Sequence, residues 1–164
     1  MTIQTGQTGQ TLPDLPLAVI DDGEKENTTT GALFAGRKVV MFAVPGAFTP
    51  TCSERHLPGY VAAFDAFRER GIEVYCLSVN DAFVMQAWAK AQSVPPGLKM
   101  LADGNAEFTR ALGLELDGSA YGLGLRARRF ALYADDGVVK WLAIEAPGEF
   151  RVTGAEAVLA AVGG

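Results

Sequence analysis

The 164-residue chain lacks the features of several large classes of protein. It holds only two cysteines, Cys52 and Cys76, which are too few for a disulfide scaffold or a structural zinc site. Its net charge of −5 leaves no basic footprint for nucleic acid, and no apolar run approaches the roughly 20 residues that span a bilayer. Residues 1–12 lack the basic and apolar regions of a secretory signal. We therefore expect a cytoplasmic protein with reduced thiols and neither nucleic-acid nor membrane partners.

What the chain does contain is typical of one globular domain over residues 1–164. Hydrophobic residues make up 49% of the sequence and charged residues 20%, as in ordinary soluble domains. No repeat, low-complexity tract or linker divides the chain. Only residues 1–16, which are polar and contain Gly and Pro, are expected to form a loose lead-in.

Apolar runs and turn signals predict alternating strands and helices. Strands are predicted at 38–44, 72–79, 99–102, 128–135 and 138–146, and helices at 52–70, 81–92, 105–112 and 153–162, with a short turn capped within 28–30. A crossover helix between the first two buried strands implies that they pair in parallel, while Asp136-Gly137 signals an antiparallel hairpin. This order predicts an α/β fold with a central mixed sheet flanked by helices, as in thioredoxin-like proteins.

Cys52 lies where a predicted buried strand has ended and a helix begins. The N–H groups of a first helical turn lack partners and carry the positive end of the helix dipole, which favours a thiolate over a thiol. Pro50 supplies no N–H and holds the chain extended into the turn. Thr49 brings a hydroxyl within three residues of the sulfur. By position alone, a small buried hydrophobe is an equally good interpretation of Cys52.

The segment PGAFTPTC (45–52), followed by SERHLPGY, resembles the active-site sequence of type II (atypical) peroxiredoxins. The pattern of Pro, three residues, Thr, two residues and Cys falls on Pro45, Thr49 and Cys52. The resemblance continues through 76–88, 101–104 and 122–132. It implies a thioredoxin-like fold, reduction of hydrogen peroxide and organic hydroperoxides, and a homodimer. In that setting Pro45 would shield the pocket from bulk thiols, and Thr49 would donate to a peroxide oxygen.

The resemblance also implies an arginine against the cysteine, from the start of a late strand and directly before an aromatic residue. Arg129, which precedes Phe130, matches this pattern. Because side chains alternate along a strand, Arg128 and Arg129 should face opposite ways, so that only one can point at Cys52. Arg129 would keep the thiolate ionised and orient the peroxide. Arg126 is the second candidate, bracing the same pocket, and Arg128 is expected to be solvated.

His56 and Cys76 each allow two interpretations. His56 lies on the same helical face as Cys52, and a cysteine–histidine dyad would indicate a hydrolase or transferase that forms acyl or alkyl intermediates. No Asn or Asp is clearly placed to orient the ring, so we expect a structural or pocket-lining role. Cys76 falls mid-strand, about 13 Å from the level of Cys52 at roughly 3.3 Å per residue. A disulfide needs Cα atoms within about 7 Å, so resolution by Cys76 would require local unfolding.

We therefore predict a peroxidase whose Cys52 sulfenic acid is reduced by an outside thiol. Glutathione with glutaredoxin is the first choice of reductant and thioredoxin the second, with no metal or organic cofactor required. The alternative is a thioredoxin-like redox-sensing or binding module with slow peroxide chemistry. A peroxide reaction no faster than that of a free thiol would indicate this alternative.

Overall fold

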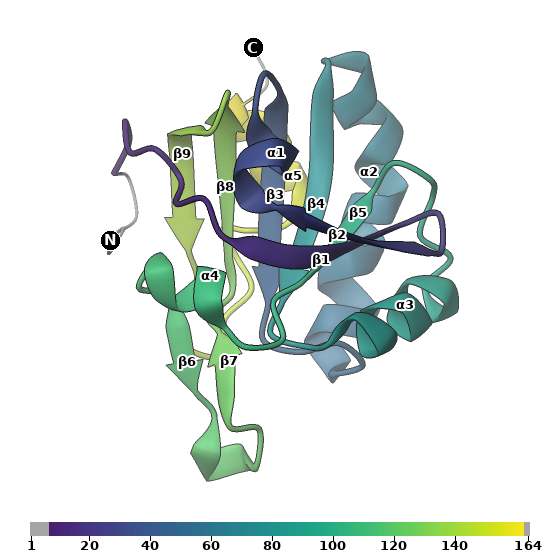
Figure 1. The fold of residues 1–164 in the computed structure, drawn as a ribbon, viewed down its shortest axis with the longest axis vertical. Coiled ribbons are helices and arrows are strands. Elements are labelled where there is room, and N and C mark those ends of the chain that lie inside the picture. The colour runs from purple at the N-terminus through teal and green to yellow at the C-terminus, as the bar shows by residue number, and fades with distance from the viewer. Residues whose placement is uncertain (1–6, 163–164) are drawn as a thin grey trace.

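A mixed sheet of seven strands runs through the protein, as the computed structural model, which describes residues 7–162, shows (Figure 1). The strands, in the spatial order β2-β1-β5-β4-β3-β8-β9, are β1 (Pro16–Asp21), β2 (Glu24–Thr29), β3 (Lys38–Val44), β4 (Ile72–Ser78), β5 (Lys99–Ala102), β8 (Phe130–Asp135) and β9 (Val138–Ile144). β3, β4 and β5 pair in parallel, while β8 and β9 add antiparallel strands. The predicted α/β fold with a mixed sheet is confirmed.

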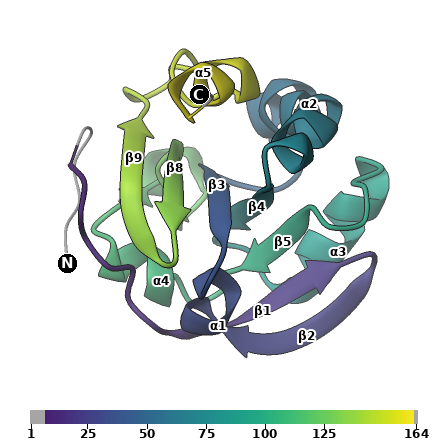
Figure 2. The ribbon, with the colours of Figure 1, turned by 90° about the horizontal axis from the view of Figure 1, so that it is seen from above.

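Helices cover both faces of the sheet. They are α1 (Thr30–Phe34), α2 (Leu57–Glu69), α3 (Ala82–Ala91), α4 (Glu107–Ala111) and α5 (Ala155–Val162). α2 and α5 lie together on one side of the sheet in Figure 2, and α1 and α4 on the other. Each face has its own apolar cluster, one containing Phe34 and Phe108, the other Phe64 and Trp88. Because β3 and β4 are buried between the two clusters, both read as continuous apolar runs in the sequence.

The N-terminal part of the chain is more ordered than the sequence predicted. β1 and β2 form a hairpin that was not predicted, since β2 (EKENTT) is polar and mostly exposed along an edge of the sheet. Residues 9–12, expected to be loose, bond to the start of β9: the Gly9 N–H donates to the Val139 carbonyl at 2.8 Å. The remainder of the predicted lead-in at 1–6 lies outside the described residues. Main-chain pairing to a distant strand leaves no side-chain pattern to detect.

A second small sheet precedes β8. β6 (Glu115–Asp117) and β7 (Leu125–Ala127) pair antiparallel, joined through a 3-10 turn at Ser119–Tyr121, and extend away from the main sheet in Figure 1. As a result, the strand predicted from residue 128 begins only at Phe130.

The helix predicted at 52–70 begins with a wider, π-type turn. The turn spans Cys52–His56, and the Leu57 N–H donates to the Cys52 carbonyl, five residues back. Pro58 explains this irregularity, because it has no N–H to donate to the Glu54 carbonyl four residues before it.

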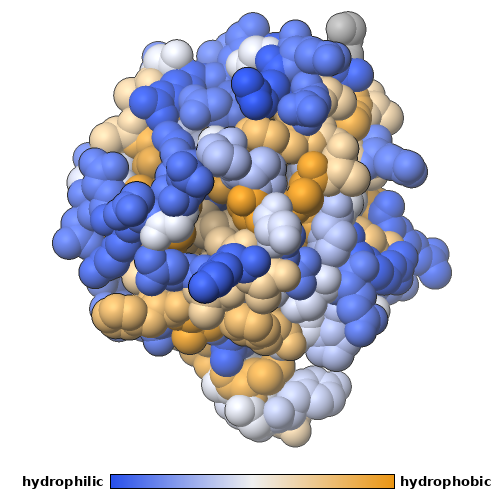
Figure 3. All heavy atoms as spheres, turned by 90° about the vertical axis from the view of Figure 1, so that its right-hand side faces the viewer, coloured by the Kyte–Doolittle hydropathy of each residue, from blue (hydrophilic) through white to orange (hydrophobic). Residues whose placement is uncertain are grey.

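Apolar side chains are not gathered into one band on the face of the molecule that Figure 3 shows; they alternate there with hydrophilic ones. None of the helices within residues 7–162 has the length and apolar character needed to cross a membrane.

Candidate active site

Cys52 lies in the first turn of the helix that follows β3. The Ser53 N–H donates to the Thr49 carbonyl at 2.9 Å, so Thr49 is the last residue before the helix and Pro50 the first inside it. Proline suits this position because its missing N–H would have no partner there. The N–H groups of Thr51 and Cys52 therefore lie at the positive end of the helix. The Cys52 side chain is fully buried.

Hydrogen bonds hold the loop between β3 and this helix, and one arginine packs against it. The Ala47 N–H donates to the Asn80 side chain at 3.0 Å. A Cβ on Gly46 would lie 3.0 Å from Arg126 Nη1 and 3.2 Å from Thr49 Cγ2, so only glycine fits without displacing them. Arg126 is fixed in turn by donating from Nε to the Leu123 carbonyl at 2.9 Å. Arg126 thus lies directly against the loop at Gly46.

Arg129 is the arginine that contacts the sulfur. Its Nη2 donates to Cys52 Sγ at 3.2 Å. Arg128 and Arg129 lie on the bend between β7 and β8, outside any strand, so alternation along a strand is not what separates them. Arg129 contacts the sulfur, whereas Arg128 shares with it only the lining of a nearby cavity. The guanidinium thus places a positive charge directly beside Sγ.

His56 is a neutral ring with both nitrogens engaged. Nε2 lies 3.0 Å from the Thr153 carbonyl, which can only accept, so Nε2 carries the hydrogen. Nδ1 is then a bare acceptor, 2.7 Å from Arg129 Nη1. Burial and, to a smaller extent, the charge of Arg129 together lower the pKa of His56 to about 3. His56 therefore has no free lone pair with which to deprotonate Cys52, and the hydrolase interpretation loses its base.

The Thr49 hydroxyl points back into its own loop. It donates its one hydrogen to the Gly46 carbonyl at 2.6 Å. Toward a ligand Thr49 can then only accept, which reverses the direction expected from the sequence. Pro45 is half-buried and, with Thr51 and Arg129, lines a cavity of about 380 Å³ beside the cysteine.

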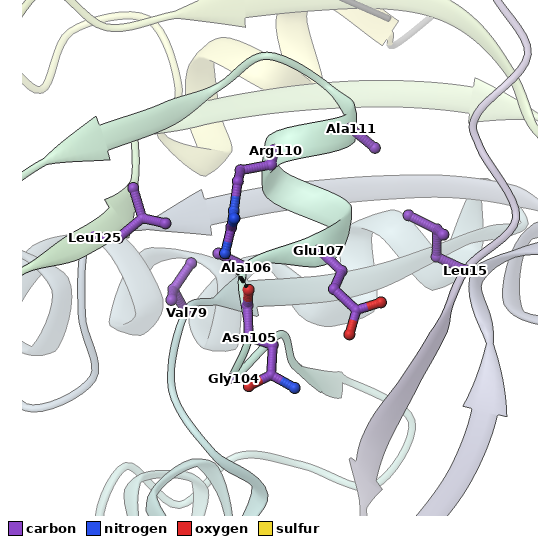
Figure 4. A pocket seen from close by; sticks show the side chains of 9 residues that line it. All are labelled: Leu15, Val79, Gly104, Asn105, Ala106, Glu107, Arg110, Ala111 and Leu125. Carbon is purple, nitrogen blue, oxygen red and sulfur yellow. Dashed lines mark hydrogen bonds between the residues drawn. The ribbon is translucent and has the colours of Figure 1, made fainter.

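The same cavity is lined by Arg128, the residue that was expected to be solvated. Arg128 is half-buried, and the remaining lining residues are Leu116, Tyr121, Glu145, Ala146, Pro147, Gly148 and Glu149. A larger hollow of about 880 Å³ lies near α4, where Arg110 donates to the Asn105 carbonyl at 2.9 Å (Figure 4). Its lining includes neither cysteine nor histidine, so we assign it no chemistry. Among residues 7–162, no group of three or more His, Cys, Asp or Glu side chains could hold a metal ion.

Cys76 is a free thiol in the core. It lies on β4 opposite Phe42, and its side chain is fully buried. Burial raises the pKa of the Cys76 thiol well above its ordinary value, and the nearby Cys52 adds to this effect. Cys76 is therefore protonated at neutral pH and a poor nucleophile.

Sequence reasoning missed three residues around the site. Phe150 packs its ring 4.9 Å from the His56 ring, and Thr153 supplies the carbonyl that His56 bonds. Glu145, just after β9, receives hydrogen bonds from the chain six to eight residues later. None of these contacts has a local sequence signal, because each depends on how the 146–154 loop closes over the helix start.

Comparison with known proteins agrees with this geometry. The Redoxin family model matches residues 7–159. Peroxiredoxin-2E of the chloroplast of Arabidopsis thaliana is 49% identical over 94% of this chain and 68% of its own length. Peroxiredoxin-2C of Oryza sativa is 48% identical over 94% of this chain and 96% of its own. The crystal structure of reduced Prx3 from Vibrio vulnificus in complex with hydrogen peroxide superposes with a TM-score of 0.88 at 51% identity, covering 94% of this chain and 98% of that one.

The site has a thiol at a helix start beside an arginine, and it lies on a mixed sheet of the kind described above. Together with the relatives, these features lead to one identification. The chain belongs to the peroxiredoxin family, in its type II branch of the thioredoxin-like superfamily, and is a thiol-dependent enzyme that reduces peroxides.

Proposed function

We propose that Cys52 is the thiol that attacks the peroxide, and that Arg129, Thr49 and Pro45 form the site around it. The observation that carries this proposal is the 3.2 Å contact from Arg129 Nη2 to Cys52 Sγ in the first turn of a helix. Two sources of positive charge, the guanidinium and the helix start, thus meet at one sulfur.

In the reaction the Cys52 thiolate attacks the terminal oxygen of the hydroperoxide in line with the O–O bond. An S–O bond forms with an electron pair from sulfur, the O–O bond breaks, and the departing oxygen leaves with that bond's pair. The terminal oxygen keeps its hydrogen, so Cys52 becomes a sulfenic acid. The departing alkoxide or hydroxide takes a proton from solvent and becomes alcohol or water. Sulfur is oxidised by two electrons and the peroxide is reduced by two.

Each neighbour has a distinct part in that step. Arg129 and the unpartnered first-turn N–H groups stabilise the charge that develops on the departing oxygen. The Thr49 hydroxyl, which donates to Gly46, accepts from the O–H of the hydroperoxide and so fixes its orientation. Pro45 forms one wall and keeps bulky thiols away from the reduced sulfur. Hydrogen peroxide and organic hydroperoxides are both substrates under this scheme.

Glutathione, working with glutaredoxin, is the reductant that the cavity supports best, with thioredoxin as the second choice. Arg128 offers a half-buried cation, and Glu149 a carboxylate, on the lining of a space of about 380 Å³. A small thiol that carries both carboxylates and an ammonium group complements this pair. One such thiol attacks the sulfenic sulfur and releases water, and a second reduces the mixed disulfide.

We also propose a homodimer, as the family resemblance implies. Phe48 and Phe83 are 56% and 75% exposed. The hydrogen bond from the Ala47 N–H to the Asn80 side chain brings the loop that carries Phe48 next to the start of α3, which carries Phe83. A second copy would cover these rings. Sedimentation velocity tests this, and a monomer across the micromolar range would refute it. The cytoplasmic location stays a prediction, since the named relatives include a chloroplast protein.

Stopped-flow fluorescence tests the proposed function directly. Trp88 provides the signal, because its Nε1 donates at 3.0 Å to the hydroxyl of Ser53, the residue after Cys52. Fast quenching or enhancement by hydrogen peroxide, absent in Cys52→Ser, is the expected result. A rate no greater than that of free cysteine would support the redox-sensing module instead.

A further inference from the structure

Glu145 is a buried carboxylate that organises the loop after β9. Its side chain accepts the Arg151 N–H at 2.8 Å, the Val152 N–H at 2.8 Å, and the Thr153 N–H and hydroxyl at 2.9 and 2.8 Å. The residue is only 4% exposed. Burial would raise the pKa of this carboxyl, but these donors hold it below its ordinary value. Glu145 is therefore an anion that dictates where residues 151–153 lie.

The carbonyl of Thr153, a residue fixed in this way, faces the active site. Its carbonyl accepts from His56 Nε2 at 3.0 Å and from the Tyr60 hydroxyl at 2.7 Å. A carbonyl at this place selects the His56 tautomer that carries its hydrogen on Nε2. Only that tautomer leaves Nδ1 free to accept from Arg129 Nη1 at 2.7 Å.

Glu145 also holds Arg129 through the main chain. The Glu145 N–H donates to the Arg129 carbonyl at 2.9 Å. The N–H of Glu145 thus fixes the backbone of Arg129. The Glu145 carboxylate fixes the guanidinium indirectly, through hydrogen bonds by way of Thr153 and His56. With Nη1 on His56, Nη2 is left for the sulfur of Cys52.

We propose that Glu145 is a positioning residue for the peroxidase reaction: through the Thr153 carbonyl it fixes the His56 tautomer, and through His56 it aims the Arg129 guanidinium at Cys52. This rests on the proposed roles of Cys52 and Arg129. The Glu145 carboxylate bonds Arg151, Val152 and Thr153 and not the sulfur of Cys52, so we assign its effect on the peroxide step to Thr153, His56 and Arg129.

His56 makes the proposal directly measurable, because it is the only histidine in the chain. Nitrogen-15 labelling of histidine gives one ring spectrum, and its two shifts identify the tautomer. In the wild-type protein we expect the Nε2–H tautomer alone from pH 5 to 8. In Glu145→Gln the single amide oxygen cannot accept every donor, and its NH₂ group faces N–H groups. We expect mixed tautomers, or a ring that titrates within that range.

Asp103→Asn is a matched control. Asp103 is likewise a buried carboxylate, 3% exposed, which accepts the Phe108 and Thr109 N–H groups at 3.2 and 2.8 Å and the Thr109 hydroxyl at 2.7 Å. Its hydrogen bonds hold the start of α4 and involve neither His56 nor Arg129. We expect this variant to lose stability in urea while keeping the wild-type His56 spectrum.

The kinetic readout is the second-order rate of Cys52 with hydrogen peroxide. Because small misplacements of catalytic groups have large effects, Glu145→Gln should lower it on the order of 10- to 100-fold. Should that variant not fold, Thr153→Val removes only the hydroxyl donor and should shift both readouts less, in the same direction. A wild-type His56 spectrum in Glu145→Gln, or an equal change in Asp103→Asn, overturns the proposal. Since the tautomer is measured without peroxide, failure here is distinct from failure of Cys52 to react.

Discussion

Arg129→Ala is the substitution that tests the site most severely. The side chain donates to Cys52 Sγ at 3.2 Å and to His56 Nδ1 at 2.7 Å, and both bonds vanish in the variant. The buried Nδ1 is left without a donor, and the sulfur loses its nearest cation. We expect the alkylation of Cys52 to require a higher pH and the peroxide step to slow.

The size of the effect follows from the loss of a fixed donor. Removing one such donor from a site of developing negative charge costs on the order of 10²- to 10³-fold in rate, or about 3–4 kcal/mol. We therefore expect a loss of at least about 100-fold in the second-order rate with hydrogen peroxide. Arg129→Lys keeps the charge but not the two-pronged geometry, and should recover only part of the rate.

Iodoacetamide alkylation against pH measures the ionisation of Cys52, and stopped-flow fluorescence measures the peroxide step. Arg128→Ala is the comparison, since the neighbouring guanidinium lines the cavity but makes no contact with the sulfur among the described residues. A larger shift of the alkylation curve in Arg128→Ala than in Arg129→Ala would mean that the wrong arginine has been assigned.

Three further predictions concern the cysteines and pH. Cys52→Ser should abolish peroxide turnover with glutathione and glutaredoxin, whereas Cys76→Ser should keep most of it; an inactive Cys76→Ser would refute the one-cysteine cycle. After one equivalent of peroxide, mass spectrometry should find a dimedone adduct at Cys52; a linked Cys52–Cys76 peptide would instead show that the helix start unwinds readily and favour thioredoxin as reductant. Since the pKa of His56 falls from 6.5 to about 3 on folding, the neutral ring stabilises the protein fully above pH 6.5, and this contribution is lost as pH falls toward 3. Urea unfolding should show a slope of up to about 1.4 kcal/mol per pH unit in that window, reduced in His56→Gln; equal slopes would refute a buried neutral histidine.

Much of the fold could be predicted because burial leaves a pattern in the sequence. β3 and β4 lie between two apolar clusters, so their residues had to be apolar throughout. β2 could not be found in this way, because an edge strand needs only main-chain partners and its side chains face solvent. The π turn at Cys52–His56 was likewise missed, although Pro58, which explains it, was visible in the sequence.

The features of the site likewise divide into those with a local sequence pattern and those without one. The sequence by itself placed Cys52 near the start of a helix after a buried strand, because the end of one apolar run and the helical spacing of the next apolar residues are local signals. Its resemblance to a known family then selected Arg129 over its neighbours.

Only the tertiary structure decided what surrounds the sulfur. Arg129 reaches Cys52 across 77 positions of sequence, and Thr153 reaches His56 across 97. The direction of the Thr49 hydroxyl, the tautomer of His56 and the anchoring by Glu145 all follow from which donors and acceptors the fold buries together. A buried polar group must find a partner wherever the chain supplies one, and that partner's position in the sequence is set by chain topology rather than by local pattern.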